Sequence, residues 1–501
     1  MNDFDVVVLG GGTAGLTAAL AARHAGASVV LVEREPGIGG DCTFYGCVPS
    51  KALIAAARIS HEARVAAAAG LLDRAPEVNG EAILEHVRAT VAAIARDERD
   101  ERFASVGIEV VHGEGRFAAP NELRIGERIL RARRFVLAVG AETVPPDIPG
   151  LDDVPYLTNR SVFSLRRLPR RLLVLGGGAT GLELAQAFCR LGTAVVVVER
   201  SERLLPAEEP EAGELAERVL RGEGVELRLG AQATAASCRN GEIVLEVDGE
   251  ELRGDALLLA TTQRPSLDGL GLGLETLGVE PDARGFVGID ERCRTSVAHI
   301  YAAGDVTGGL QLTHVAAHEG AIAGLNAAGK KRKRDVRVAP RITFLDPEIA
   351  SVGLTEAEAR AVHRDVVAAE FPMRRVDRAR IEGSADGYVK LVTARRALLG
   401  RFGGGKLVGA HVAGPRAGEL IAECALAMQT NAFAGRLAQT IHAYPSVGMA
   451  VQQAAAQLSG LGRALTREPE SADRAEPGVA DESLTREQSP RPVPSGRRPR
   501  E

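Results

Sequence analysis

Tryptophan is absent from this chain of 501 residues, and aromatic side chains make up only 3% of it. Proteins that bind single-stranded nucleic acids stack the bases on aromatic rings, so this scarcity removes the usual platform. The net charge of −5 gives no general attraction for a polyanion either. A hydrophobic content of 45% and a charged content of 25% are ordinary for a folded globular protein. We therefore expect no nucleic acid among the main partners.

Long apolar runs are also missing, since no stretch reaches the length that a membrane span needs. Residues 1–4 lead directly into a strand-like run, without a basic segment or a cleavage site, so we expect no secretory signal. The chain has only six cysteines. These features predict a cytoplasmic protein with no membrane partner, in which a close cysteine pair serves catalysis or metal binding rather than structure.

A glycine-rich turn near the start of the chain is typical of a dinucleotide site. The predicted order is strand (5–9), glycine turn (10–15), helix (to about 24) and second strand (28–32), ending at Glu33. The glycines permit a tight turn and close approach of a pyrophosphate, and the helix start offers free N–H groups to it. The glycines concerned are Gly10, Gly12 and Gly15. Glu33 is expected to accept hydrogen bonds from ribose hydroxyls.

The whole pattern recurs 166 residues later. The predicted order there is strand (172–175), glycine turn (176–181), helix (182–191) and second strand (194–198). The equivalent positions are held by Gly176, Gly178, Gly181 and Glu199. A single glycine turn of this kind arises readily by chance, whereas two copies with the same internal spacing do not. We therefore expect two dinucleotides on one chain, namely FAD and a nicotinamide.

The acid of the second site bears on which nicotinamide is bound. Glu199 suits a ribose 2′-hydroxyl and repels a 2′-phosphate, which favours NADH over NADPH. Arg200 and Arg203 follow closely and are either phosphate ligands or part of a solvated turn. The sequence leaves both interpretations open.

Two cysteines, Cys42 and Cys47, lie in the run GGDCTFYGCVPSK at 39–51. A gap of four residues lets the sulfurs bond only in a short, strained loop, and strained, accessible disulfides are the reducible ones. A thiolate at a helix start also has a lowered pKa. A pair of this kind, directly after a dinucleotide site, predicts electron transfer between a bound cofactor and a dithiol.

These motifs resemble the pyridine nucleotide–disulfide oxidoreductases, the flavoprotein family of dihydrolipoamide dehydrogenase, glutathione reductase and mercuric reductase. Further matching runs are IYAAGD (300–305), TFLDPE (343–348) and AGPRAGEL (413–420). The resemblance covers residues 4 to about 460. It implies an α/β fold of two Rossmann-like dinucleotide-binding domains with a C-terminal α+β dimerisation domain that builds a homodimer.

The implied domain boundaries place an insertion within the first domain. The FAD-binding domain comprises 1–148 and 270–335, the NAD(P)H-binding domain 149–269 and the dimerisation domain 340–462. Residues 463–501 are rich in Glu, Arg, Pro and Ser and have few large aliphatic residues, so we expect a disordered tail.

The resemblance also implies roles for individual residues. Cys47 faces the flavin in charge-transfer contact, and Cys42 is the interchange thiol that meets the acceptor. Lys51 pairs with Glu183 near the flavin N5, and Asp305 binds the ribityl chain. The remaining expected flavin contacts are Gly40, Gly115 and Gly140. No resident metal site is expected.

The resemblance breaks at 442–449, HAYPSVGM. Members that act on thiols have His-x-His-Pro-Thr-x-x-Glu here, and their second His serves as acid and base across the dimer interface. Tyr444 stands at that position and Met449 at the position of the orienting Glu. A tyrosine with a pKa near ~10 is a poor base at pH 7, and losing the base costs roughly 10²–10⁴-fold. Lipoamide and glutathione are therefore weakened as substrates.

Mercuric reductases resemble this chain in having Tyr at that position, but they also carry a C-terminal cysteine pair. The last cysteine here is Cys424, so that pair is missing. Our first hypothesis is an FAD-dependent NAD(P)H oxidoreductase that passes electrons through Cys42–Cys47 to a small-molecule acceptor, either a disulfide or a thiophilic metal ion such as mercury. The alternatives are direct reduction of a quinone or dye by the flavin, dithiol oxidation of the dihydrolipoamide type, and a redox-responsive interaction protein.

Overall fold

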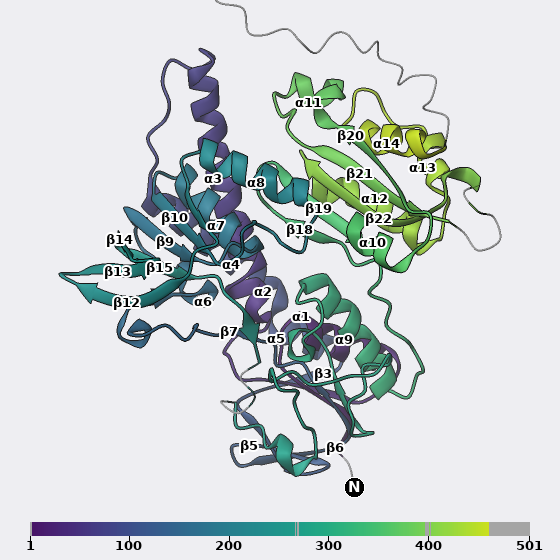
Figure 1. Cartoon of the computed structure of the whole chain (residues 1–501). Coiled ribbons are helices and arrows are strands. Elements are labelled where there is room, and N and C mark those ends of the chain that lie inside the picture. The colour runs from purple at the N-terminus through teal and green to yellow at the C-terminus, as the bar shows by residue number, and fades with distance from the viewer. Residues whose placement is uncertain (1–2, 266, 268–269, 396–399, 401, 460–501) are drawn as a thin grey trace, which may run out of the picture.

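A computed structural model of the chain describes residues 3–265, 267, 270–395, 400 and 402–459 (Figure 1). The predicted tail at 463–501 lies outside the described residues. Along the described ranges, no helix is both long and apolar enough to cross a membrane.

The first sheet is built around two Val-rich central strands, residues 4–9 and 29–33, whose side chains are largely buried on both faces. Its parallel core runs β3-β2-β1-β6, with β17 beside β6, and β5 and β4 extend it in antiparallel fashion. The bounds are β1 (Phe4–Leu9), β2 (Val29–Glu33), β3 (Ile108–His112), β4 (Gly115–Ala119), β5 (Glu122–Ile125), β6 (Arg128–Leu137) and β17 (Ile300–Ala302). Helices α1 (Thr13–His24) and α9 (Thr313–Ala327) pack together beside this sheet.

The second sheet repeats the parallel arrangement in the order β11-β10-β9-β15-β8. Its elements are β8 (Tyr156–Leu157), β9 (Arg171–Leu175), α7 (Ala179–Arg190), β10 (Ala194–Glu199), α8 (Pro210–Gly222), β11 (Glu226–Leu229) and β15 (Ala256–Leu259). An antiparallel sheet of β12 (Ala233–Arg239), β13 (Glu242–Val247) and β14 (Glu250–Gly254) adjoins it. The chain passes between the two parallel sheets through a short ribbon of β7 (Glu142–Thr143) paired with β16 (Gln263–Arg264).

The third sheet is antiparallel, in the order β18-β19-β22-β21-β20. Its strands are β18 (Arg341–Thr343), β19 (Glu348–Gly353), β20 (Val367–Pro372), β21 (Tyr388–Ala394) and β22 (Lys406–Gly414). The associated helices are α10 (Glu356–Val362), α11 (Asp377–Ile381), α12 (Ala417–Gln429), α13 (Ala434–Gln439) and α14 (Met449–Ser459). The predicted fold class, with two Rossmann-like units and a C-terminal α+β unit, is confirmed.

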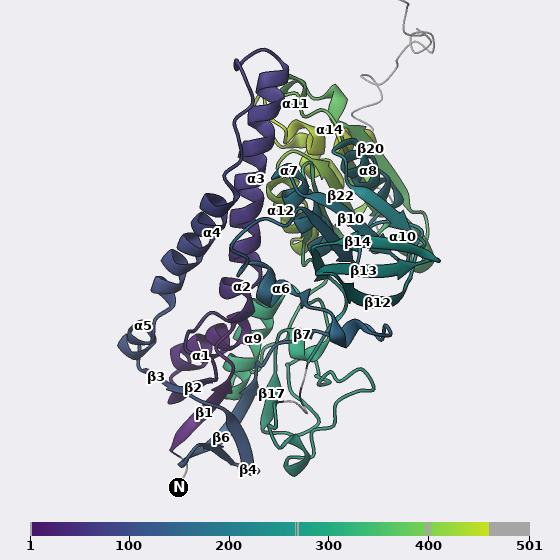
Figure 2. The same cartoon turned by 90° about the vertical axis from the view of Figure 1, so that its left-hand side faces the viewer.

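The helices between β2 and β3 carry the cysteine segment. They are α2 (Gly40–Phe44), α3 (Cys47–Ala68), α4 (Gly80–Ala95) and α5 (Asp100–Ser105). A short helix later in the chain, after β8, is α6 (Asn159–Val162). Figure 2 shows α3 rising from α2 past α7, with α4 along its outer side. Leu53 of α3 and Leu84 of α4 are buried in one core with α7 residues such as Phe188. This packing fixes the cysteines against the second nucleotide domain.

One boundary prediction is corrected by the structure. The helix expected at 182–191 begins at Ala179, directly after Gly178, so the last glycine of the turn lies inside the helix. Glu33 and Glu199 are the final residues of β2 and β10, where the sequence predicts the ends of these strands. Both residues are paired in parallel register with the neighbouring strand, β3 or β11.

Candidate functional site

The first glycine turn is built by close backbone contacts. Gly10 has φ +99°, and a Cβ there would lie 2.3 Å from the carbonyl oxygen of Ala138. A Cβ on Gly15 would lie 1.8 Å from the carbonyl oxygen of Gly10, so neither position accepts a side chain. At Gly12 the nearest atom to a Cβ is 3.8 Å away, which leaves space in front of the helix start. This cradle fits a pyrophosphate.

The second turn repeats this geometry. Gly176 has φ +114°, and its Cβ would lie 2.4 Å from the carbonyl oxygen of Ala260. A Cβ on Gly181 would lie 2.1 Å from the Gly176 carbonyl oxygen, whereas a Cβ on Gly178 would meet no atom within 4 Å. The chain therefore has two cradles of the same construction, each at the start of a helix.

Glu33 and Glu199, at the ends of β2 and β10, stabilise these turns by hydrogen bonds. Glu33 accepts hydrogen bonds from the N–H of Gly11 at 2.6 Å and of Glu35 at 2.8 Å. Glu199 accepts from the N–H of Gly177 at 2.6 Å and of Ser201 at 2.7 Å. The sequence predicted only ribose contacts for both acids. The structure adds a second task, since each carboxylate holds its own glycine turn in place.

The cysteine segment is docked directly on the first turn. The Gly39 N–H donates to the Gly11 carbonyl at 2.9 Å. Gly40 has φ +61°, and a Cβ there would lie 2.6 Å from the Cα of Gly12. Two glycine backbones therefore touch, and this contact places Cys42, on α2, beside the nucleotide cradle.

Cys42 and Cys47 are both half-buried, and their sulfurs are not joined in this structure. Cys47 is the first residue of α3. A hydrogen bond from the Cys42 thiol lowers the pKa of Cys47 to about 6, and the Thr313 hydroxyl, at 3.1 Å from its Sγ, and Lys51 act in the same direction. The same hydrogen bond and burial raise the pKa of Cys42. The reduced pair therefore consists of a Cys47 thiolate and a protonated Cys42.

Lys51 and Glu183 connect three parts of the chain. Lys51 Nζ donates to Glu183 Oε2 at 2.7 Å and lies 4.4 Å from the ring centroid of Phe344. The other Glu183 oxygen accepts from the Phe344 N–H at 2.8 Å. Glu183 is 5% exposed, so this ion pair is largely shielded from water on the carboxylate side. The lysine is thereby held one helical turn from Cys47.

Two further acids lie beside the cysteines. Burial, together with Asp41, Glu319 and Cys47, raises the pKa of Asp305 to about 6. Burial also raises the pKa of Asp41, although Asn159 Nδ2 donates to both of its oxygens at 3.0 and 3.1 Å. No role for Thr313, Asp41 or Asn159 was predicted from the sequence. The position of Thr313 at a helix start was the one available signal for it.

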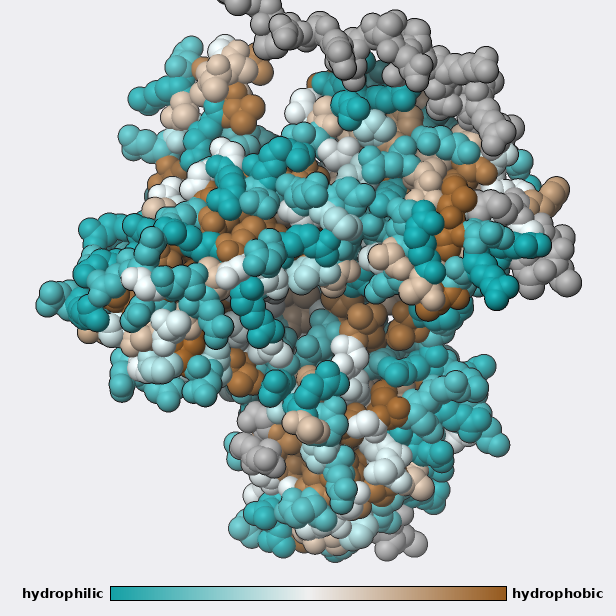
Figure 3. Space-filling model, in the orientation of Figure 1, coloured by the Kyte–Doolittle hydropathy of each residue, from teal (hydrophilic) through white to brown (hydrophobic). Residues whose placement is uncertain are grey.

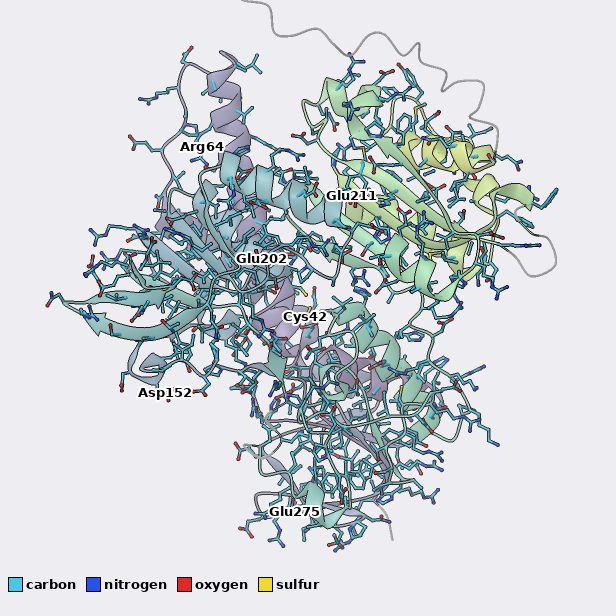
Figure 4. All side chains as sticks on the ribbon, viewed as in Figure 1. Cys42, Arg64, Asp152, Glu202, Glu211 and Glu275 are labelled. Atoms are coloured by element: carbon cyan, nitrogen blue, oxygen red, sulfur yellow. The ribbon has the colours of Figure 1, made fainter. Side chains whose placement is uncertain are left out.

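The predicted site residues line connected cavities. One cavity contains Cys42, Cys47, Lys51 and Glu183. A neighbouring cavity contains Glu33, Gly40 and Gly115, and the two share lining residues such as Gly12, Gly140 and Asp305. The first glycine turn, the cysteines and Asp305 therefore line two adjacent cavities that share part of their lining. Figure 3 shows a hollow near the centre of this face, where Figure 4 places Cys42 between the three sheets.

The second cradle opens into a separate cavity of about 740 Å³. Its lining includes Gly176, Gly178, Glu199 and Arg200. Arg203 instead donates to the carbonyls of Pro206 and Glu208, at 2.9 and 3.4 Å. Of the two arginines, Arg200 is thus the one that lines the cavity, whereas Arg203 stabilises the loop in which it lies.

Tyr444 and its neighbours lie on the third domain, away from these cavities. The Tyr444 side chain is 70% exposed, and its hydroxyl donates to Asp377 Oδ2 at 3.0 Å. This hydrogen bond raises the pKa of Tyr444. His442 contacts Glu423 Oε2 at 3.1 Å and the Thr440 carbonyl at 3.0 Å, and Met449 begins α14. Within one chain, the structure does not bring Tyr444 to the cysteines.

Comparison with known proteins gives matches along most of the chain. The model of the pyridine nucleotide-disulphide oxidoreductases matches residues 4–320, and the model of their dimerisation domain matches residues 339–455. A mercuric reductase from Streptomyces lividans is 38% identical over 467 residues, which cover 90% of this chain and 95% of that protein. A dihydrolipoyl dehydrogenase from Thermus scotoductus is 35% identical over 472 residues, which cover 91% and 98%.

Two solved structures have the same architecture. LpdA from Mycobacterium tuberculosis superposes with a TM-score of 0.81 at 30% identity, covering 90% of this chain and 99% of that one. The Cu(II) complex of RclA from Escherichia coli, an HOCl-induced flavoprotein disulfide reductase, has a TM-score of 0.81 at 26% identity and coverage of 91% and 100%.

Proposed function

Since this chain belongs to the pyridine nucleotide-disulphide oxidoreductase family, we propose that it reduces a thiophilic metal ion, such as mercury, or a disulfide with electrons from NADH. At the level of the family, it is an NAD(P)H-dependent flavoprotein disulfide oxidoreductase that uses FAD and a pyridine nucleotide. The acceptor and the choice of NADH are our inference. The observation that carries it is the position of Cys42 and Cys47 in one cavity with Lys51, Glu183 and Gly12 of the first nucleotide cradle.

FAD, when bound, supplies the two-electron link between the nicotinamide and the cysteine pair. The residues that would hold it are Gly10, Gly12, Gly15, Glu33, Gly40, Lys51, Gly115, Gly140 and Asp305. The fit is supported by the open space at Gly12 and by the two adjacent cavities, of which one is lined by Glu33 and the other by the cysteines. Lys51 would place its ammonium group near the reacting atoms. Its ion pair with Glu183 means that no unpaired charge is left in this partly buried site.

The acceptor follows from what the thiols can do without a nearby base. Oxidation of an incoming dithiol needs a group that takes its protons, and Tyr444, with a raised pKa, is poorly suited to that task. A soft metal ion binds thiolates directly and needs only the Cys42 proton to leave. This reasoning favours a metal ion over lipoamide or glutathione. It is supported by the Cu(II) complex of RclA. Sequence identity does not separate the acceptors, since mercuric reductases match at 34–38% and dihydrolipoyl dehydrogenases at 34–35%.

The coenzyme proposal rests on the second cradle. Glu199 lines its cavity and favours a free 2′-hydroxyl. Of the two nearby arginines, Arg200 also lines the cavity, while Arg203 is engaged with its own loop. We therefore expect kcat/KM for NADH to exceed that for NADPH by tenfold or more, about 1.4 kcal/mol. Equal values for the two coenzymes would contradict this assignment.

A second candidate is direct reduction of a quinone or dye from the flavin, with the cysteines as bystanders. The departure at Tyr444 and Met449 favours it, because such a reaction needs no acid–base pair at that position. The two candidates differ in their dependence on Cys42.

Replacement of Cys42 separates these candidates. Cys42→Ser should lower NADH oxidation driven by mercuric ion by about 10³-fold or more, because one of the two sulfurs is lost. Rapid bleaching of the flavin by NADH should persist in the same variant. Cys238→Ser, which removes an exposed cysteine elsewhere, is the matched control and should change neither rate. If Cys42→Ser turns over at the wild-type rate, the metal proposal fails and the quinone candidate gains.

A further inference from the structure

A row of polar side chains crosses the antiparallel sheet of the dimerisation domain. Arg341 of β18 lies opposite Ser351 of β19, which in turn lies opposite His411 of β22. His411 lies opposite Lys390 of β21. Side chains that stand directly opposite each other in an antiparallel ladder share one face of the sheet. Arg341, His411 and Lys390 therefore form a line of basic side chains on one face.

Three acids of the second nucleotide domain pack against this row. Glu208 Oε1 accepts a hydrogen bond from Arg341 Nε at 2.9 Å. Lys390 Nζ lies 3.0 Å from Glu209 Oε2 and 2.9 Å from Glu211 Oε1. Figure 4 shows Glu211 at the end of α8 that faces the antiparallel sheet. The Glu209 and Lys390 side chains are only 3% and 7% exposed, so this acidic segment is fixed on the dimerisation domain by shielded ion pairs.

The residues just before these acids form part of the wall of the second cavity. Pro206 lines the cavity that contains the second glycine turn. Arg341 reaches the next residue, since its Nη2 lies 3.5 Å from the carbonyl oxygen of Ala207. Arg203, from the nucleotide domain itself, donates to the Pro206 carbonyl at 2.9 Å. The loop is therefore held by one arginine from each domain.

Two features make this loop dependent on such support. Leu205 has φ +48°, a left-handed conformation that a leucine side chain disfavours. The Glu208 side chain is 11% exposed and is paired with Arg341. Loss of the arginine would leave a largely buried carboxylate without this cation, which favours a rearrangement that returns the carboxylate to water.

We propose that Arg341 is a positioning residue for the nicotinamide coenzyme. Through Glu208 and the Ala207 carbonyl, it keeps the loop at 205–208 in the conformation that places Pro206 in the cavity wall. The dimerisation domain thus contributes to coenzyme affinity without lining the cavity. This inference rests on the proposed binding of NADH in that cavity and is independent of the electron acceptor.

Titration calorimetry of the FAD-loaded full chain with NAD⁺ measures coenzyme affinity without turnover. Arg341→Met should raise the Kd for NAD⁺ about tenfold, because the loop would then hold the binding conformation for about a tenth of the time. Arg341→Lys keeps a cation beside Glu208 and should restore most of the affinity. Arg337→Met removes an arginine that is 60% exposed and paired with Asp335, and as the matched control it should change nothing.

Anaerobic rapid mixing with NADH separates binding from hydride transfer. In Arg341→Met the Kd from the concentration dependence of flavin bleaching should rise by the same factor, whereas the limiting rate at saturating NADH should equal that of the wild type. An unchanged Kd for NAD⁺ in Arg341→Met with wild-type flavin content would overturn the proposal. A lower limiting rate with an unchanged Kd would do so as well.

Glu208→Gln tests the route of the effect. It removes the carboxylate that Arg341 holds, so it should also weaken NAD⁺ binding. The double variant Arg341→Met/Glu208→Gln should bind no more weakly than Arg341→Met, since both changes break one contact. Fully additive losses would show that Arg341 does not act through Glu208. If Arg341→Met does not retain its flavin, Glu208→Gln decides the matter, and an unchanged Kd there would overturn the proposal.

Gly178→Asp distinguishes a failure of this inference from a failure of the cavity assignment. Gly178 is the N-cap of α7, where aspartate is a favoured residue, and its carboxylate would repel a pyrophosphate from the cradle. NAD⁺ binding should be lost. If Gly178→Asp binds NAD⁺ normally, the coenzyme binds elsewhere and both proposals fail. If binding is lost there but is normal in Arg341→Met, only the role of Arg341 fails.

Discussion

At the scale of single residues, the protonation of the two cysteines depends on a few specific donors. Cys42 and the Thr313 hydroxyl both stabilise the Cys47 thiolate, and the pKa of Cys47 is lowered to about 6 as a result. Since the thiolate is the reactive form, cysteine-dependent turnover should be constant well above pH 6 and should fall as the pH drops through that value.

Removing the Thr313 hydroxyl should shift that profile. Thr313→Ala loses one hydrogen bond to a charged sulfur, so the pKa of Cys47 should rise and the acid limb of kcat/KM should move up by about one pH unit. Thr313→Ser keeps the hydroxyl and should retain the wild-type profile. Identical acid limbs in the Ala and Ser variants would show that Thr313 does not control this titration.

The sequence predicts site residues well where a short spacing defines the chemistry. The spacings from Cys42 to Cys47 and from Cys47 to Lys51 are local, so the sequence alone predicts them. The roles of Thr313 and Asn159 could not be predicted, because these residues contact Cys47 and Asp41 only through tertiary packing across long sequence separations. The same holds for the carboxylates of Glu33 and Glu199, whose direction depends on where each strand ends.

At the scale of elements, the contact between the cysteine segment and the first glycine turn is the tightest joint of the site. Gly40→Ala would place a methyl group 2.6 Å from the Gly12 Cα and should force the two loops apart. We expect a large loss of bound FAD, measured as flavin absorbance per chain after gel filtration.

A matched variant separates this clash from simple backbone strain. Gly70 has φ +74°, similar to the +61° of Gly40, but a Cβ there meets nothing within 4 Å. Gly70→Ala should therefore incur only the cost of a left-handed alanine, roughly 1–2 kcal/mol, and keep its flavin. Equal flavin content in the two variants would rule out a special role for the Gly40–Gly12 contact.

Element prediction succeeded where hydrophobic periodicity was strong. The Val-rich strands β1 and β10 and the helix α1 were predicted from their patterns, and the repeated spacing indicated the second unit. The start of α7 was missed because the glycine turn masks the first helical residues. Glycine has a low helix propensity, but Gly181 lies inside the helix where a Cβ would come within 2.1 Å of the Gly176 carbonyl oxygen.

At the scale of the whole molecule, the dimerisation domain exposes several large apolar side chains. Ile441 is 95% exposed, and its neighbours Tyr444 and His442 bind Asp377 and Glu423 on α11 and α12. Those helices also expose Ile381 and Leu426, at 70% and 64%. We infer that this surface contributes to the homodimer that the family's dimerisation domain implies.

Introducing a charge at Ile441, the most exposed of these apolar residues, tests whether this surface forms the homodimer. Ile441→Glu should convert a dimer of 52.6 kDa chains to monomers, as measured by sedimentation velocity, because an unpaired charge would be buried at the interface. Val362→Glu changes a residue of α10 that is 67% exposed and should leave the dimer intact. A dimer that persists in Ile441→Glu would place the interface elsewhere.

The two carboxylates that close the glycine turns have a consequence for redesigning coenzyme preference. Changing Glu199 to a neutral or basic residue, the obvious route toward NADPH, also removes the acceptor for the Gly177 and Ser201 N–H groups. An engineered variant thus needs a replacement acceptor at this strand end. Under the proposed preference for NADH, coenzyme specificity and turn stability depend on the same side chain, so they must be changed together.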